Sequence, residues 1–67
     1  MAIRFDRLFK LMEQKGLKKY YLRQNGIHPG VIEKLAKNMR VDTVTIDKLC
    51  ALLECQPGDI MEYMDEK

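Results

Sequence analysis

Apolar residues recur in this chain at the spacing of an α-helix, and this periodicity restricts the folds that the chain can adopt. The spacing i, i+3, i+4, i+7 occurs twice, in Phe5, Leu8, Phe9 and Met12 and again in Ile46, Leu49, Cys50 and Leu53. Residues at these offsets share one face of a helix. Apolar and polar residues nowhere alternate for long, and only residues 41–46 are rich in β-branched side chains. The pattern predicts an all-α fold.

Turn and capping residues divide this pattern into short segments. Gly and Asn-Gly follow apolar stripes, Pro suits the first position of a helix, and His or Asp can cap the N–H groups that follow. The residues that act in this way are Gly16, Asn25-Gly26, His28-Pro29, Asp42 and Pro57. We therefore expect a compact bundle of five short helices, over residues 5–15, 18–25, 29–37, 43–53 and 57–63.

Length and composition agree with one small globular domain spanning residues 1–67. The chain is 46% hydrophobic and 33% charged, which is ordinary for a soluble protein and too apolar for a disordered one. It has no uncharged run long enough to cross a bilayer. Charged residues interrupt the N-terminal apolar stretch, so a signal peptide is not expected. These features predict a cytoplasmic protein without a membrane partner.

The net charge of +2 conceals an uneven distribution. Residues 1–40 hold ten Lys or Arg against three acidic residues, a net of +7. Residues 41–67 hold two Lys against seven acidic residues, a net of −5. The N-terminal part is therefore suited to a polyanion, although solvated surface charge is the usual explanation for basic residues taken singly.

The residues needed for catalysis or for a metal site are missing. Serine is absent, and His28 is the only histidine. Cys50 and Cys55 are five residues apart, which is neither a C-x-x-C pair nor half of a zinc site. We interpret them as reduced thiols that pack as small hydrophobic groups. The sequence therefore predicts a protein that is not an enzyme and that carries no cofactor or metal.

Residues 18–37 have the form of a helix-turn-helix unit. Two short helices are joined by a tight glycine turn, and the second begins at Pro29. Such a unit holds its second helix at a fixed angle so that it can enter a DNA major groove about 12 Å wide. If Ile32 and Leu35 face inward, helical geometry turns outward Pro29, Gly30, Glu33, Lys34 and Lys37.

At these residues the chain resembles the Cro/repressor-type helix-turn-helix family, also called the xenobiotic-response-element family of bacterial and phage regulators. The resemblance extends over nearly the whole chain and is strongest to small, single-domain bacterial members with a lambda repressor-like fold. It rests on R-L-F-K-L-M-E-Q-K-G-L, on N-G-I-H-P-G-V-I-E-K-L and on T-I-D-K-L-C-A-L-L-E-C-Q-P-G-D-I-M-E-Y.

The resemblance implies which positions meet DNA. Base edges would face Pro29, Gly30 and Lys34, with His28 and Glu33 beside them. Phosphates would be contacted at the start of the second helix by Lys18, Lys19 and Tyr20, and in the loop after the third by Lys37, Asn38 and Arg40. Phage repressors carry amide side chains where this chain has Pro29 and Gly30, which cannot contact adenine bidentately. Direct readout would then depend mainly on Lys34.

The expected function is sequence-specific transcription regulation by a homodimer on double-stranded DNA, with half-sites about 34 Å apart. Met61, Tyr63 and Met64, in the acidic C-terminal part, are candidates for the dimer surface. A second hypothesis is a protein-interaction module, antitoxin-like or adaptor-like, that uses the same fold without reading sequence. The absence of amides at Pro29 and Gly30 supports this alternative. No small-molecule ligand is indicated.

Overall fold

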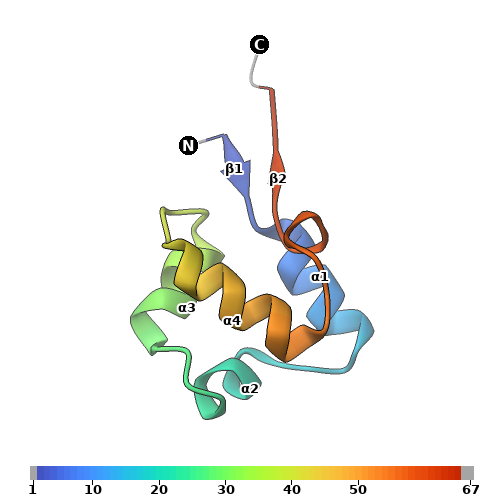
Figure 1. The fold of residues 1–67 in the computed structure, drawn as a ribbon, viewed down its shortest axis with the longest axis vertical. Helices are drawn as coiled ribbons and strands as arrows, with labels where there is room; N and C mark the ends of the chain where they lie inside the picture. The colour runs from blue at the N-terminus through green and yellow to red at the C-terminus, as the bar shows by residue number, and fades with distance from the viewer. Residues whose placement is uncertain (1, 66–67) are drawn as a thin grey trace.

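The computed structural model describes residues 2–65 and contains four α-helices (Figure 1). They are α1 (Asp6–Gln14), α2 (Lys19–Gln24), α3 (Pro29–Ala36) and α4 (Thr43–Leu53). Each lies within a residue or two of its predicted bounds, which confirms the first four predicted helices. The β-branched residues after Val41 form the first turns of α4 and not a strand.

The four helices pack around one hydrophobic core. Its members come from every helix and from the segments between them, and seven of them are less than 2% exposed. The core residues are Phe5, Leu8, Met12, Leu22, Ile27, Ile32, Leu35, Leu49, Leu53 and Ile60. Phe9, Ile46 and Cys50, which belong to the predicted stripes, are only partly buried at the edge of this core. The helical periodicity therefore identified the buried faces correctly but overestimated their width.

All four helices end in the same way, with a left-handed residue that lets the chain turn back on the last carbonyls. Gly16 and Gly26 take this role after α1 and α2, with φ of +71° and +92°. Asn38 and Glu54 take it after α3 and α4, with φ of 56° and 53°. In each case the next N–H donates to a carbonyl five residues earlier, which is the Schellman motif. These bonds are Leu17–Met12 (2.8 Å), Ile27–Leu22 (3.0 Å), Met39–Lys34 (2.8 Å) and Cys55–Cys50 (3.0 Å).

The fifth predicted helix is wrong. Residues 57–63 form a single 3₁₀ turn, η1 (Pro57–Asp59), followed by an extended segment. The Asp59 carboxylate accepts a hydrogen bond of 2.9 Å from the Gln56 N–H and closes the turn. Ile60 then enters the core, where it is fully buried. Once Ile60 is anchored there, the chain leaves the helical direction and pairs with the N-terminal segment.

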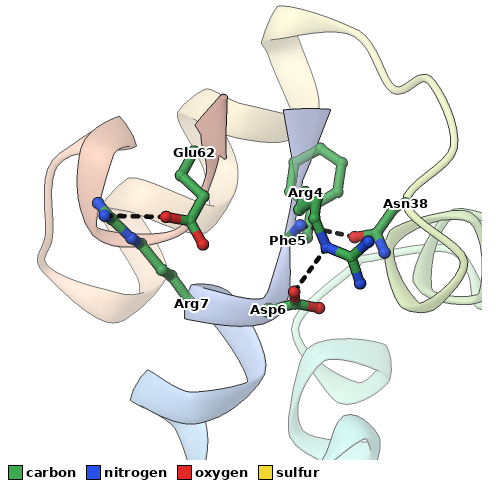
Figure 2. A network of polar contacts seen from close by, with 6 residues as sticks. All are labelled: Arg4, Phe5, Asp6, Arg7, Asn38 and Glu62. Atoms are coloured by element: carbon green, nitrogen blue, oxygen red, sulfur yellow. Dashed lines mark hydrogen bonds and ion pairs between the residues drawn. The ribbon is translucent and has the colours of Figure 1, made fainter. Parts of the chain in front are cut away.

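The fold is mostly helical, as predicted, but it is not purely so, because a two-stranded antiparallel sheet joins segments near the two ends of the chain. Strand β1 (Ile3–Arg4) pairs with β2 (Glu62–Tyr63), with Ile3 opposite Tyr63 and Arg4 opposite Glu62. The sheet stands away from the helices at one end of the molecule (Figure 1). Arg7 of α1 supports the sheet, because its guanidinium lies 3.0 Å from the Glu62 carboxylate (Figure 2). The same guanidinium donates a hydrogen bond of 2.8 Å to the Gly58 carbonyl.

Asp42 caps α4, as predicted, and the stability that this carboxylate provides should depend on pH. Its carboxylate accepts a 2.8 Å hydrogen bond from the Thr45 N–H, and this bond holds the pKa of Asp42 below its usual value. A carboxyl whose pKa is lowered by folding stabilises the fold above its unfolded-state pKa, and this contribution is lost as the pH falls through the folded-state value.

Asp42→Asn keeps a capping oxygen but removes the titration. At neutral pH we expect thermal unfolding of the two proteins, followed by circular dichroism, to be similar. In the acid range the wild type should lose stability relative to Asp42→Asn. The other carboxyl groups are the same in both proteins, so their contribution to the pH dependence cancels in the difference. A stability difference that stayed constant from neutral to acid pH would contradict this assignment of the cap.

Candidate nucleic-acid interface

Helices α2 and α3 are held together by the turn between them. Gly26 adopts the positive φ that lets the chain reverse, and Ile27 follows it directly into the core at 4% exposure. Leu22 of α2 is fully buried beside it, while Ile32 and Leu35 bury the inner face of α3. The angle between α2 and α3 is therefore set by packed side chains and by the hydrogen bond from the Ile27 N–H to the Leu22 carbonyl.

His28, Pro29 and Gly30 form the start of α3. The Nδ1 atom of His28 accepts a hydrogen bond of 2.9 Å from the Gly30 N–H, which confirms His28 as the N-cap. His28 and Pro29 are exposed, whereas Gly30 is half-buried. A Cβ added at Gly30 would lie 3.1 Å from His28 Nδ1, so the capping ring closely covers this position. Of these three predicted base-facing residues, His28 and Pro29 are thus the accessible ones.

The outward face of α3 carries an ion pair. Glu33, Lys34 and Lys37 are all exposed, as predicted. The Lys37 ammonium lies 2.8 Å from a carboxylate oxygen of Glu33, one helical turn away. The hydrogen bond and the charge of Lys37 hold the pKa of Glu33 below its usual value, so Glu33 stays ionised. The pair is electrically neutral, and Lys34 therefore provides the net positive charge of this face.

The structure brings Lys34 next to the loop that follows α3. Lys34 and Arg40 line one shallow hollow of about 290 Å³, together with Val31, Val41, Asp42 and Thr45. Lys34, which was predicted to face bases, and Arg40, which was predicted to contact phosphates, are therefore neighbours. Thr45 was not predicted as a site residue, and its place in the first turn of α4, just after the basic loop, is the signal that could have indicated it.

The start of α2 lies against the start of α3. Lys19, Tyr20 and Arg23 share a hollow of about 260 Å³ with Pro29 and Ile32. Tyr20 is 63% exposed, so it presents its ring at the surface and not in the core. Arg23 was not among the predicted site residues, although its spacing of four from Lys19 places the two on one helical face. The structure thus groups the basic residues of α2 beside the N-terminus of α3.

Lys18 and Lys19 differ in their surroundings. Both are exposed. The Lys19 ammonium lies 5.4 Å from the centre of the Phe9 ring, a cation–π contact that holds it near α1. Lys18 is the extended residue just before α2 and carries no side-chain cap bond to that helix. Both remain accessible to a phosphate.

Asn38 has a structural role that its place in a basic loop did not indicate. Its side-chain oxygen accepts a hydrogen bond of 2.7 Å from the Phe5 N–H, across 33 residues of sequence (Figure 2). Phe5 is a buried core residue at the start of α1. Asn38 therefore ties the loop after α3 to α1, and only its amide nitrogen remains available for a phosphate.

Metal and membrane features are not found in the described part of the chain. Across residues 2–65, no three His, Cys, Asp or Glu side chains gather closely enough to hold a metal ion. None of the helices in that range combines the length and apolarity needed to cross a membrane. Cys50 and Cys55 are free thiols, as expected, but both are half-buried and not enclosed in the core.

Comparisons with known proteins agree with this geometry. A model of the Cro/C1-type helix-turn-helix DNA-binding domain matches residues 7–66. The crystal structure of the transcriptional regulator VanUg, form II, aligns with a TM-score of 0.89 at 29% sequence identity, over 97% of this chain and 88% of that one. The comparison with curated proteins gave no match. Because the family model covers α2, α3 and the elements that pack on them, the chain belongs to the Cro/C1-type helix-turn-helix DNA-binding domain family.

Proposed function

We propose that this chain is a sequence-specific transcription regulator that inserts α3 into the DNA major groove. The observation that carries the proposal is the grouping of basic side chains around α3. Lys19 and Arg23 adjoin its N-terminus, and Lys34 adjoins Arg40 near its C-terminus. A cationic surface of this kind on both sides of one exposed helix is suited to two phosphate backbones flanking a groove.

The proposed roles follow from the chemistry of each group. Lys34 donates to guanine O6 and N7, because an ammonium can reach both acceptors in the major groove. Lys18, Lys19 and Tyr20 contact phosphates on one side, while Lys37, Asn38 and Arg40 contact them on the other. The residues that lie nearest the base edges determine how α3 fits in the groove, and they are His28, Pro29, Gly30 and Glu33.

Binding to random and selected DNA duplexes over a salt series tests the function. A regulator should show a log K against log salt slope of about −0.9 for each phosphate contacted. It should also prefer its selected site over random DNA by roughly 10³-fold or more. Weak binding without sequence preference would contradict the proposal. That result would favour the alternative of an antitoxin-like or adaptor-like interaction module, which Pro29 and Gly30 support because they lack side-chain amides.

Two lysine substitutions separate base readout from phosphate contact. Lys34→Ala is expected to relax preference at one base pair and to cost about 1–3 kcal/mol on the preferred sequence. Lys37→Ala is expected to weaken binding to all sequences alike, because it removes a phosphate contact and leaves the Glu33 carboxylate without its 2.8 Å partner. Competition binding with duplexes changed at single base pairs measures both effects.

Glu33→Gln provides the matched control. In that background Lys37→Ala should cause a smaller uniform loss, since no carboxylate is exposed when the lysine is removed. Sequence-independent losses of equal size from Lys34→Ala and Lys37→Ala would contradict the readout role of Lys34.

We further propose that the chain binds as a homodimer through its C-terminal part. Tyr63 is 70% exposed and Met64 43% exposed, while Met61 is half-buried beside them in sequence. Exposed aromatic and Met side chains are enriched at protein interfaces. Size-exclusion chromatography with light scattering should give twice the monomer mass at high concentration. Tyr63→Ser should lower this measured mass toward that of the monomer. A monomer at every concentration tested would contradict the proposal.

A further inference from the structure

We propose that the paired thiols at the C-terminal end of α4 form a binding site for trivalent arsenic that carries one organic substituent. Cys50 and Cys55 are both free and half-buried. They line the same groove, of about 470 Å³, with Ile46, Pro57 and Met61 among its other residues. The groove lies between α4 and the segment around η1, so this site is independent of the DNA-binding face proposed above.

The end of α4 brings the two thiols together. The Cys55 N–H donates to the Cys50 carbonyl at 3.0 Å, in the Schellman motif that ends the helix. That motif commonly sets the side chains of these two positions against each other as an apolar contact. The equivalent positions after α1 and α2 hold the apolar pairs Met12–Leu17 and Leu22–Ile27. After α4 both positions carry sulfur, and the Cys50 thiol lies close enough to raise the pKa of the Cys55 thiol.

Two adjacent thiols condense with an organic arsenic(III) oxide without any change of oxidation state. The arsenic–oxygen bonds break and two arsenic–sulfur bonds form. Both thiol protons leave with the oxygen as one water molecule, and arsenic remains trivalent. The product is a closed ring containing arsenic and both sulfurs. The reaction needs no oxidant, reductant or further reactant.

This chemistry suits the thiols better than metal binding or disulfide formation. Burial raises the pKa of the Cys55 thiol, and the neighbouring Cys50 thiol raises it further. The thiolate is the form that coordinates metal ions and attacks disulfides, so a raised pKa disfavours both. Condensation uses the protonated thiol directly.

The groove favours an organic arsenical over inorganic arsenous acid. Inorganic arsenous acid has three oxygens on arsenic, so two sulfurs leave one of them in place. An arsenical with one carbon substituent has its remaining valences completed by the two sulfurs. Ile46, Pro57 and Met61 offer an apolar surface beside the thiols on which a phenyl substituent can lie.

Phenylarsine oxide added to the full chain tests the site. Intact-mass spectrometry should detect one phenylarsenic group per chain, attached with loss of two hydrogens. The adduct should survive an excess of a monothiol and should be removed by a dithiol. Cys50→Ser and Cys55→Ser should each weaken binding by about a hundredfold or more, because a second tethered contact gains at least that factor. Single-cysteine variants that bind as tightly as the wild type would overturn the proposal.

Two further measurements keep the result clear if a serine variant folds poorly. Circular dichroism identifies such a variant, and Cys50→Ala and Cys55→Ala then replace it, since Ala suits an apolar contact. The wild-type protein alone also provides a test, because an adduct released by monothiol as readily as by dithiol would show that only one sulfur holds arsenic. Equal uptake of inorganic arsenite and phenylarsine oxide would contradict the role assigned to the groove.

Discussion

Ile27→Ala is expected to lower the free energy of unfolding by about 2–5 kcal/mol, the usual cost of truncating a buried aliphatic side chain to Ala. Ile27 is 4% exposed and occupies the turn that joins α2 to α3. The stability of a chain of 67 residues is on the order of 3–10 kcal/mol. The substitution should therefore remove a large fraction of the stability of the fold. Urea unfolding followed by circular dichroism measures the change.

Val44→Ala is the matched control for Ile27→Ala. It also removes methyl groups, but Val44 is 60% exposed at the start of α4, where such changes usually alter stability by about 0.5 kcal/mol or less. At temperatures where Ile27→Ala stays folded, we also expect weaker DNA binding, because the α2–α3 angle loses its packed contact. If both variants lost the same small amount of stability, the Ile27 side chain would not be what holds the turn.

Asn38→Ala is expected to have a comparably large effect, with two separable causes. Alanine in the left-handed conformation that Asn38 adopts costs about 1–2 kcal/mol. Loss of the acceptor leaves the N–H of the buried residue Phe5 without its 2.7 Å hydrogen bond, which costs about 1–3 kcal/mol. Chemical unfolding gives the total, and the hydrogen-exchange rate of the Phe5 amide reports on the lost bond.

Asn38→Gly distinguishes the two causes. Glycine adopts a positive φ without strain, so this variant should show the loss of the hydrogen bond alone and be more stable than Asn38→Ala. It also distinguishes the structural role from a phosphate contact. If Asn38→Gly weakened DNA binding while stability and Phe5 exchange were unchanged, the tie to α1 would not be the main function of this residue.

Helix positions and most of the buried residues were predictable because their signals are local. The Asp42 cap acts over three residues, and the His28 cap over two. Periodicity compares residues within two turns of a helix. The same local reasoning could have found the Glu33–Lys37 pair, which spans four residues on α3. It identified the outward face of α3 but not the partial burial of Gly30 under the capping ring.

The larger errors concern segments whose partners are distant in sequence. Helical signals at Pro57 and Asp59 are real, since they begin η1, but Ile60 and the pairing of Glu62 with Arg4 end the helical course after one turn. In the sequence, Asn38 looks like an ordinary loop residue between Lys37 and Arg40. Its hydrogen bond with Phe5 depends on how α1 packs against α3. The two cysteines show a mixed case, since the backbone hydrogen bond between them is local but the groove that they line is formed by α4 and the segment around η1.

The sequence by itself determined the four α-helices, their caps, the inner face of each and the family to which the chain belongs. These depend on hydrogen bonds and apolar spacing within a few residues, so each short segment contains the residues that determine its local structure. Only the tertiary structure decided that the ends of the chain pair as strands, that Asn38 anchors α1, and that Lys34 and Arg40 share one hollow. Each of these requires segments far apart in sequence to meet, and their meeting is set by the packing of all four helices together.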